Sequence, residues 1–381
     1  MKDYLERYGR GFIEVDLDAV IQNVMSMKGN ISKDSKIIAV IKTDGYGHGS
    51  IAVAKALDAL DCIYGYAVAT EEEAIELLDA GVHKPVMILG YTFPYAYEEM
   101  AARGIETAVF REDMLKEMGE AALRAGKNMR VHVKVDTGMG RIGITPDEAG
   151  LRFVEQVAQT PGLTIAGIFT HFARADEADK SSAYKQYESF LHFTEQVEQR
   201  GITGFIRHCA NSAAILEMPD TCLDAVRAGI LLYGLRPSAE MNMEILSLKP
   251  ALSFYSSIIY IKEMPEGCPI SYGGTFVTPG PMRVATIPIG YGDGYPRSLS
   301  GKGYVLIHGK KAPILGRICM DLMMVDVTMI EEAVPGSLVT LIGRDGEQVI
   351  SADELGELSG RFNYELICDL GKRIPRLYTG G

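Results

Sequence analysis

Short apolar runs alternate with segments of helical period between residue 36 and about residue 235. Eight runs have the length and composition of strands; in chain order they are KIIAVIK, GYAVAT, PVMILG, ETAVF, MRVHVKVD, LTIAGIFTH, FIRHCA and AVRAGILLYG. Segments between them, such as EDMLKEMGEAALRAG, repeat apolar residues every three to four positions, as amphipathic helices do. This alternation predicts an α/β fold, a (β/α)8 (TIM) barrel, although an open doubly wound sheet would give a similar pattern.

The pattern changes after LRPSAEMNMEILSLKP. The later segments ALSFYSSIIYIKEM, MRVATIPIG, GYVLIHGKKAPILGRICMDLMMVDV and SLVTLIGRD read as strands separated by Gly and Pro turns, with almost no helical period. We therefore predict a barrel domain over residues 1–244 and a mostly-β domain over residues 245–381. RGFIEVDL reads as a strand before the first barrel unit, and the first ~10 residues could pair with the second domain.

Composition narrows the class of protein. The chain has 381 residues and a formal net charge of −12, which argues against a surface for nucleic acid or anionic membranes. Six cysteines without a C-x-x-C pair are typical of reduced thiols rather than of disulfides or a zinc site. The N-terminal segment has no signal-peptide pattern, and no apolar run approaches the ~18 residues that span a bilayer. We expect a cytoplasmic protein with no membrane or nucleic-acid partner.

Polar residues and a glycine stand where four of the predicted strands end. They are Lys42, His171, Asn211 with Ser212, and Arg227 with Gly229. The C-terminal ends of barrel strands meet at one mouth, where such barrels carry their active sites. We therefore expect these residues to converge on a single site.

The segments NSAAI and RAGI place small residues between a strand and a following helix. The backbone around Asn211, Gly229 and Ile230, with the hydroxyl of Ser212, would bind an anion there with help from the helix dipole. The loops after strands seven and eight are the usual phosphate site of this fold. Ser212 could equally be an ordinary helix N-cap.

Lys42 ends an apolar run and precedes glycines 45, 47 and 49. A P-loop would place its glycines before the lysine, so that interpretation fails. Two others remain open: a structural salt bridge, and an amine whose pKa burial lowers for Schiff-base chemistry. A lysine across the barrel from a phosphate site, with aromatic residues between, indicates pyridoxal 5′-phosphate (PLP). The glycines would let backbone lie close to that cofactor, and Tyr46 could reach its phosphate.

Seven blocks, in this order and spacing, resemble the bacterial alanine racemases: AVIKTDGYGHGS, VKVDTGMGRIG, HCANSAA, VRAGILLYG, ISYGGTF, GYGDGY and GRICMD. The resemblance covers essentially the whole chain. It implies a PLP-dependent isomerase that interconverts L- and D-alanine and supplies D-alanine for cell-wall peptidoglycan. It also implies a PLP-bearing barrel, a C-terminal β domain and a homodimer whose active sites are shared between subunits.

The resemblance assigns two bases on opposite faces of the substrate α-carbon. Lys42 would be the Schiff-base lysine and act on the D enantiomer, and Tyr272 of the partner subunit would act on the L enantiomer. Arg227 would hydrogen-bond the pyridine nitrogen of PLP without protonating it, because arginine keeps its proton. His171 would orient Tyr272. Without the resemblance, Tyr272 would be a common strand aromatic and His171 a core histidine.

The resemblance also assigns substrate contacts. Arg141 would contact the phenol oxygen of Tyr272 or the substrate carboxylate. It would be supported by Lys134, whose counterpart is carbamylated in some family members. The backbone N–H of Met320 would bind the substrate carboxylate, with help from Asp321. Taken alone, Met320 and Asp321 would be a buried methionine and a surface aspartate.

Three tyrosines bear on substrate size. Tyr364 matches the family tyrosine that touches the cofactor phosphate and narrows the pocket, where related serine racemases tend to carry a smaller polar residue. Tyr291 and Tyr295 resemble the aromatic gate of the entrance channel. Tyr364 therefore favours alanine, and the gate also favours a small substrate. Gly45 stands where alanine is commoner in the family, a departure from which we infer no change of chemistry.

Other functions fit parts of the pattern. A serine or broad-specificity racemase would use the same machinery, and a PLP-dependent decarboxylase of the same fold would usually place an acidic residue where this chain has Arg227. A PLP-binding homeostasis protein would match the barrel alone. A metal-dependent hydrolase would need an H-x-H or H-E-x-x-H pattern, which the seven histidines lack. We therefore expect an alanine racemase without a metal.

Overall fold

The computed structural model describes residues 7–381, which divide into two compact units. The barrel unit consists of residues 20–45 and 50–249, and the β unit of residues 7–19, 46–49 and 250–381. Residues 1–6, part of the segment expected to pair with the second domain, lie outside the described residues.

Eight parallel strands form the core of the barrel unit: β2 (Lys36–Val40), β3 (Ile63–Val68), β4 (Val86–Ile88), β5 (Glu106–Val109), β6 (Met129–Lys134), β7 (Leu163–Phe169), β8 (Ile206–His208) and β9 (Ala225–Ala228). Their order, β8-β7-β6-β5-β4-β3-β2-β9, follows the chain around a ring. Beyond β8, Arg227 N donates to Ala210 O (2.9 Å), which nearly closes the ring. An open doubly wound sheet would reverse its order at a switch point. The predicted barrel is therefore confirmed.

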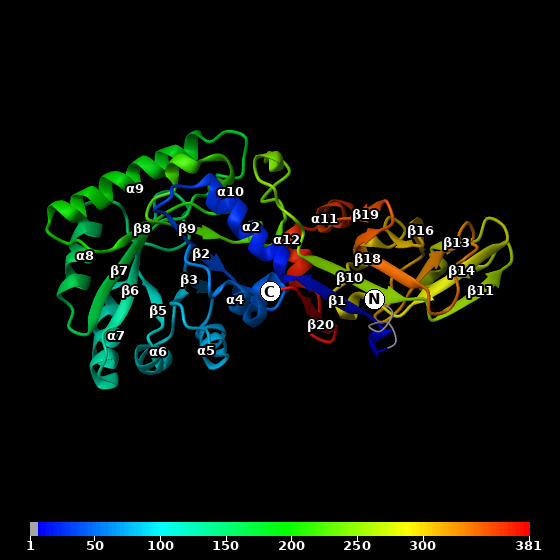
Figure 1. Ribbon diagram of the computed structural model, residues 1–381, viewed down its shortest axis with the longest axis horizontal. Coiled ribbons are helices and arrows are strands. Elements are labelled where there is room, and N and C mark those ends of the chain that lie inside the picture. Colours follow the sequence, from blue (N-terminus) through cyan, green and yellow to red (C-terminus); the bar gives the residue numbers. More distant parts are fainter. Residues whose placement is uncertain (1–6) are drawn as a thin grey trace. The chain divides into compact units, whose positions relative to one another are not determined.

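Helices lie outside these strands (Figure 1): α2 (Leu17–Asn30), α4 (Ser50–Leu57), α5 (Glu71–Asp79), α6 (Tyr97–Arg103), α7 (Glu112–Ala125), α8 (Glu148–Gln159), α9 (Ser181–Gln199) and α10 (Ser212–Glu217). Short 3-10 turns are η1 (Pro94–Ala96), η2 (Pro219–Thr221), η3 (Ile230–Tyr233) and η4 (Met243–Ile245). The amphipathic pattern explains the packing: in α8, for example, the buried residues Leu151, Val154 and Val157 recur at helical spacing.

The β unit is built on one large sheet, so the predicted mostly-β character is confirmed. Its strands are β1 (Phe12–Asp16), β10 (Leu252–Ser257), β11 (Tyr260–Met264), β14 (Met282–Ile287), β15 (Tyr304–Ile307), β16 (Lys310–Leu315), β17 (Met323–Asp326), β18 (Leu338–Asp345), β19 (Gln348–Ile350) and β20 (Arg376–Thr379). β1 pairs antiparallel with β10 and parallel with β20. Smaller elements are β12 (Pro269–Ile270), β13 (Phe276–Val277), η5 (Tyr272–Gly274), η6 (Tyr291–Asp293), η7 (Arg297–Leu299), α11 (Ala352–Ser359) and α12 (Asn363–Cys368).

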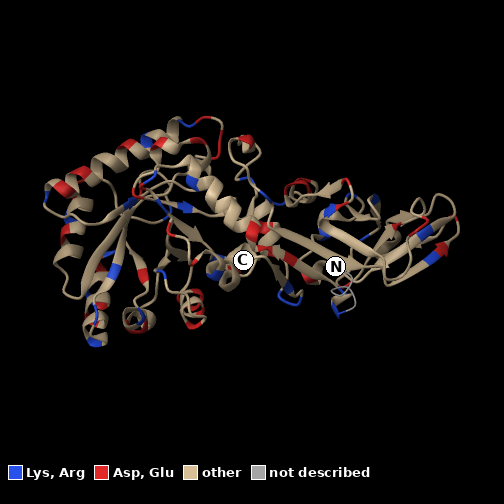
Figure 2. Ribbon diagram, in the orientation of Figure 1, with Lys and Arg blue, Asp and Glu red and all other residues tan. Residues whose placement is uncertain are grey.

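Two further observations concern the surface. Within residues 7–381, no helix combines the length and the apolar composition needed to cross a membrane. Acidic and basic residues are intermixed along outer helices of the barrel unit, including α9 (Figure 2). This mixture is typical of solvated helical faces.

Candidate active site

Lys42 follows β2 and opens α3 (Lys42–Tyr46), a turn with left-handed backbone. The φ values lie between 51° and 62° at the four residues after it, Thr43, Asp44, Gly45 and Tyr46. This conformation costs roughly 1–2 kcal/mol for each residue other than glycine. Two carboxylates support it: Glu73 Oε1 accepts from Thr43 N (2.5 Å), and Asp44 Oδ1 accepts from Ser50 N (2.9 Å). The supported turn holds Lys42 at the C-terminal end of its strand.

Arg227 lies on β9 and is 3% exposed. Nη1 donates to the carbonyl oxygen (2.7 Å) and Nδ1 (2.9 Å) of His208. Nη2 donates to the carbonyl oxygens of Thr170 (2.6 Å) and Cys209 (3.1 Å) and to Nδ1 of His171 (3.2 Å). Nε–H finds no acceptor among residues 7–381. Burial lowers the pKa of Arg227 to about 10, so the group remains a cation at neutral pH, with one donor available to a ligand.

His171 is the point around which the predicted basic residues gather. Its Nδ1 accepts from Arg227, so Nε2 carries the proton of a neutral ring. Burial first, and then the positive charges of Arg227, Arg141, Lys134 and Lys42, hold the pKa of His171 well below its usual value. The structure therefore brings these four residues around one imidazole, which has an N–H to donate.

Lys134, on β6, is 2% exposed, and its Nζ donates to the carbonyl oxygen of Val135 (2.6 Å). Burial, and then the charge of Arg227, lower the pKa of Lys134 to about 8. A fraction of its amine is therefore neutral near physiological pH. Arg141 is exposed in the loop that follows, where Asp136 Oδ1 accepts from the backbone N–H groups of Gly138 (3.0 Å), Met139 (2.8 Å) and Gly140 (3.1 Å).

The two predicted phosphate-binding segments are joined by a hydrogen bond. Ser212 Oγ accepts from Gly229 N (2.9 Å). The N-cap of α10 is Asn211, whose side chain accepts from Ala214 N (3.1 Å), so the alternative of Ser212 as an N-cap is wrong. The backbone N–H groups of Ser212 and Ile230 each open a helix and have no acceptor in the described part of the chain. These N–H groups could hold an anion.

Tyr272 lies on η5 of the β unit and is 70% exposed. The residue before it, Ser271, has φ of 63°, and its hydroxyl donates to Arg317 O (2.5 Å). A hollow of about 590 Å³ is lined by Ser271, Tyr272, Gly273, Cys319, Met320, Asp321 and Leu322. The structure thus brings Tyr272, Met320 and Asp321 to one hollow.

Asp293 links segments beside this hollow through ion pairs. It is buried, and its Oδ1 accepts from Arg10 Nη1 (2.8 Å) and Arg373 Nε (2.7 Å). Arg373 also binds Asp321 (2.8 Å). The backbone N–H of Met320 has no acceptor within residues 7–381, so it is available to a carboxylate.

The remaining predicted tyrosines also belong to the β unit. The rings of Tyr46 and Tyr364 have centres 5.9 Å apart, and Tyr364 stacks on Phe362 at 4.4 Å. Burial raises the pKa of Tyr46, so its phenol stays protonated. Tyr291 is 41% exposed, whereas Tyr295 is 1% exposed. This burial within its unit gives no support to Tyr295 as part of an entrance gate.

The sequence indicated no role for three buried residues near Arg227, namely Glu106, His132 and His208. His208 Nε2 meets His132 Nδ1 (3.0 Å), and His132 Nε2 meets Glu106 Oε2 (2.7 Å). The available signal was the presence of titratable residues inside otherwise apolar strands, which usually indicates paired polar groups.

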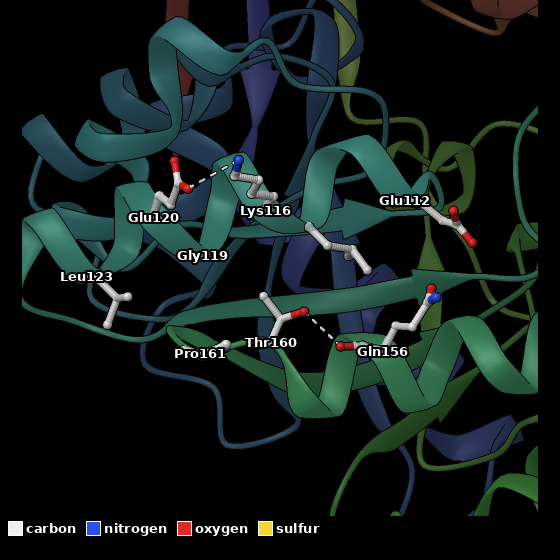
Figure 3. A pocket seen from close by; sticks show the side chains of 9 residues that line it. Glu112, Lys116, Gly119, Glu120, Leu123, Gln156, Thr160 and Pro161 are labelled. Carbon is white, nitrogen blue, oxygen red and sulfur yellow. Dashed lines mark hydrogen bonds and ion pairs between the residues drawn. The ribbon is translucent and has the colours of Figure 1, made fainter.

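A second hollow, of about 430 Å³, lies between α7 and α8 (Figure 3). Its polar lining includes an ion pair between Lys116 and Glu120 (3.9 Å) and a hydrogen bond from Thr160 Oγ1 to Gln156 O (2.7 Å). These groups belong to the outer helical surface and its loop, and none of the predicted site residues is among them.

The donors in the barrel unit fit PLP. A pyridine nitrogen accepts one hydrogen bond, as from Arg227 Nε; a phosphate accepts from backbone N–H groups, as from Ser212 and Ile230; and an aldehyde reacts with an amine, as on Lys42. The barrel unit could therefore hold this cofactor.

Comparisons with known proteins agree with this chemistry. Two family models match: "Alanine racemase, N-terminal domain" over residues 15–237 and "Alanine racemase, C-terminal domain" over residues 251–378. The alanine racemase of Clostridium perfringens is 42% identical over 365 residues, which cover 96% of this chain and 94% of that one. The alanine racemase of Desulforamulus reducens is 44% identical over 368 residues, which cover 96% and 98%.

Solved structures show the same relationship. The alanine racemase of Clostridium difficile 630 superposes with a TM-score of 0.93 at 37% identity, covering 97% of this chain and 96% of that one. The alanine racemase of Bacillus anthracis with bound L-Ala-P superposes with a TM-score of 0.91 at 38% identity, covering 98% and 96%. Because both family models match and the relatives align over nearly the full length, the chain belongs to the alanine racemase family.

Proposed function

We propose that this chain interconverts L- and D-alanine with PLP as cofactor. The observation that carries the proposal is the buried Arg227: its Nη1 and Nη2 have acceptors, whereas its Nε–H has none among the described residues. Arg227 also lies with the other cations around His171. PLP, when bound, stabilises the negative charge that develops on the α-carbon of an amino acid. An arginine at the pyridine nitrogen donates a hydrogen bond and keeps its proton, which should limit side reactions such as transamination.

Residues from four segments of the chain would hold the cofactor. Lys42 would hold it covalently, and Arg227 would donate to its ring nitrogen. The phosphate would be bound by the backbone N–H groups of Ser212 and Ile230, with Tyr46 and Tyr364. Asn211 and Gly229 would support this site, since Asn211 caps α10 and Gly229 holds the Ser212 hydroxyl.

Two bases would move the α-proton, one on each face of the substrate. We assign Lys42 to the D enantiomer and Tyr272 to the L enantiomer. The 70% exposure of Tyr272 suits a base that serves the barrel of a second copy, so we propose a homodimer with shared sites. His171 Nε2–H would donate to the phenol oxygen of Tyr272 and orient it.

The substrate carboxylate would be bound by the free N–H of Met320 and by Arg141, with Lys134 and Asp321 in support. The rings of Tyr364 and Tyr291 would limit the side chain to the size of alanine. Asp293 contributes indirectly, because it holds Arg373, which in turn binds Asp321.

The proposal also includes the cellular location of the protein and the use of its product. All six cysteines are free thiols, which supports a cytoplasmic location. The product D-alanine would supply cell-wall peptidoglycan.

Chiral product analysis and α-proton exchange in deuterium oxide test the function, with PLP-loaded protein offered L-alanine, L-serine and L-lysine side by side. We expect D-alanine to appear fastest, and no product from the control Lys42→Ala. Faster serine turnover would favour a serine or broad-specificity racemase. Carbon dioxide release would favour a decarboxylase, and bound PLP without turnover would contradict an enzymatic role.

A further inference from the structure

A chain of hydrogen bonds runs from Arg227 through the interior of the barrel unit to β5. Arg227 Nη1 meets His208 Nδ1 at 2.9 Å. His208 Nε2 meets His132 Nδ1 at 3.0 Å, and His132 Nε2 meets Glu106 Oε2 at 2.7 Å. All four residues are between 0% and 3% exposed, so water does not compete for these bonds. We call this chain of four residues the relay.

The two ends of the relay determine the direction of each hydrogen bond. Arg227 can only donate, and an ionised Glu106 can only accept. A neutral imidazole donates from one nitrogen and accepts at the other. His208 and His132 must therefore both carry their proton on Nε2, because reversing either ring would set two donors or two acceptors against each other.

The charges agree with this arrangement. Burial, and then the charge of Arg227, keep the pKa of His208 well below its usual value, so its ring is neutral. Burial by itself would raise the pKa of Glu106, but His132 and Arg130 outweigh it and the net pKa is lowered. The hydrogen bonds of Arg227 all go to neutral acceptors, so Glu106 is the carboxylate to which the buried guanidinium is linked.

Gly167 leaves the space in which the two histidines meet. Its strand, β7, lies between β6 and β8, and Gly167 pairs with His132 in the register. A Cβ at this position would overlap Nδ1 of His132 and lie 2.8 Å from Cε1. Phe169, on the same strand, stacks on His208 with ring centres 4.9 Å apart. Two residues of β7 thus contact the two histidines of the relay.

We propose that Glu106 is a positioning residue for Arg227. It supplies the terminal acceptor that keeps both histidines protonated on Nε2, and so presents His208 Nδ1 to the guanidinium as an acceptor. With Nη1 and Nη2 held in this way, Nε–H remains the donor for the pyridine nitrogen. The inference deepens the proposed function and rests on it, since that nitrogen belongs to the proposed cofactor.

Glu106→Gln tests the direction of the relay. Glu106 Oε1 also accepts from Arg130 Nε (2.6 Å), and an amide has a single oxygen. We expect this oxygen to face the charged Arg130, so that the amide NH2 faces His132 and reverses both rings. Arg130→Met alone leaves the relay intact. The double variant Glu106→Gln/Arg130→Met frees the amide oxygen for His132 and should restore the original tautomers.

The first readout is ¹⁵N NMR of histidine-labelled, PLP-loaded protein, with signals assigned by their loss in His132→Gln and His208→Gln. Wild type, Arg130→Met and the double variant should show Nε2–H at both rings, and Glu106→Gln should show Nδ1–H. Glu71→Gln is the matched control, because Glu71 is 6% exposed and binds Tyr95 outside the relay. Wild-type His208 protonated on Nδ1, or unchanged tautomers in Glu106→Gln, would overturn the proposal.

The second readout is retention of PLP during dialysis, followed by its visible absorption. Losing a hydrogen bond that involves a charged group corresponds to about tenfold or more in affinity, and we expect this loss in Glu106→Gln alone. Reversed tautomers with unchanged PLP retention would refute the positioning role. A wild-type protein with the expected tautomers that fails to racemise alanine would refute the proposed function and leave the assigned relay standing.

Discussion

The side-chain amine of Lys134 is buried near Arg227, where a positive charge is unfavourable. Burial and Arg227 lower its pKa from 10.5 to about 8. Between these two values the unfolded chain binds more protons than the folded chain, so stability rises with pH across that window. Below pH 8 both states are protonated, and the unfavourable burial of charge is fully present. Above 10.5 both are neutral, and the penalty is gone.

Lys134→Met removes this charge and keeps a stem of similar length. Since each pKa unit corresponds to ~1.4 kcal/mol, we expect the free energy of unfolding at pH 7 to rise by up to ~3 kcal/mol. The gain should disappear at pH 10.5. Urea unfolding at both pH values measures it. A variant destabilised equally at both would show that the hydrogen bond to Val135 outweighs the charge.

The two proposed bases should have separable signatures. Lys42→Ala should abolish the visible absorption of covalently held PLP, because no amine remains at that position. Tyr272→Phe should keep the absorption and lose turnover by ~10²-fold or more, the usual contribution of an acid–base group. Exchange of the α-proton in deuterium oxide should survive better from D-alanine than from L-alanine. Normal racemisation by Tyr272→Phe would exclude the two-base assignment.

At the scale of elements, the turn after β2 shows what its glycines do. Gly45 has φ of 62°, within a run of left-handed residues. A Cβ on Gly47 would overlap the carbonyl oxygen of Ile367, within the β unit. The sequence predicted that these glycines let the backbone lie close to the cofactor. In the structure the close approach at Gly47 is made by the backbone of Ile367, and this contact could not be foreseen because Ile367 is far away in the sequence.

Gly167→Ala tests whether the relay needs a residue without a side chain at this position of β7. The added methyl would overlap His132, so we expect a loss of about 1–3 kcal/mol in stability, as overpacking usually costs. The His132 and His208 tautomers should also become mixed. Gly29→Ala is the control: it lies in α2 with nothing within 4 Å of an added Cβ, and alanine is the better helix former. Equal stability of the two variants would contradict a crowded relay.

At the scale of the whole molecule, the shared site predicts complementation between two inactive variants. In a heterodimer of Lys42→Ala and Tyr272→Phe chains, one site combines the intact Lys42 and the intact Tyr272, and the other has neither. Random mixing in a two-fold dimer should therefore recover about one quarter of wild-type activity. Activity measured after co-refolding tests this. If each site used residues of a single chain, mixing would recover nothing.

The sequence by itself determined the order and type of the elements, because hydrophobic period is a local property of each segment. It also determined which residues stand at strand ends, and parallel strands then necessarily bring Lys42, His171 and Arg227 to one mouth. The blocks around them carried the family resemblance that the comparisons confirmed. The barrel and the family could therefore be predicted from the sequence, whereas the roles of these residues stay a prediction.

Only the tertiary structure decided which interior groups meet. Glu106, His132 and His208 come from three strands, and the relay exists because the register of β6 and β7 places Gly167 beside His132. The burial of Tyr295 likewise depends on how the whole β unit folds, and the residues next to it in the sequence do not indicate it. A period of two along a strand says which face a side chain occupies, while its hydrogen-bond partner depends on the stagger of strands distant in the chain.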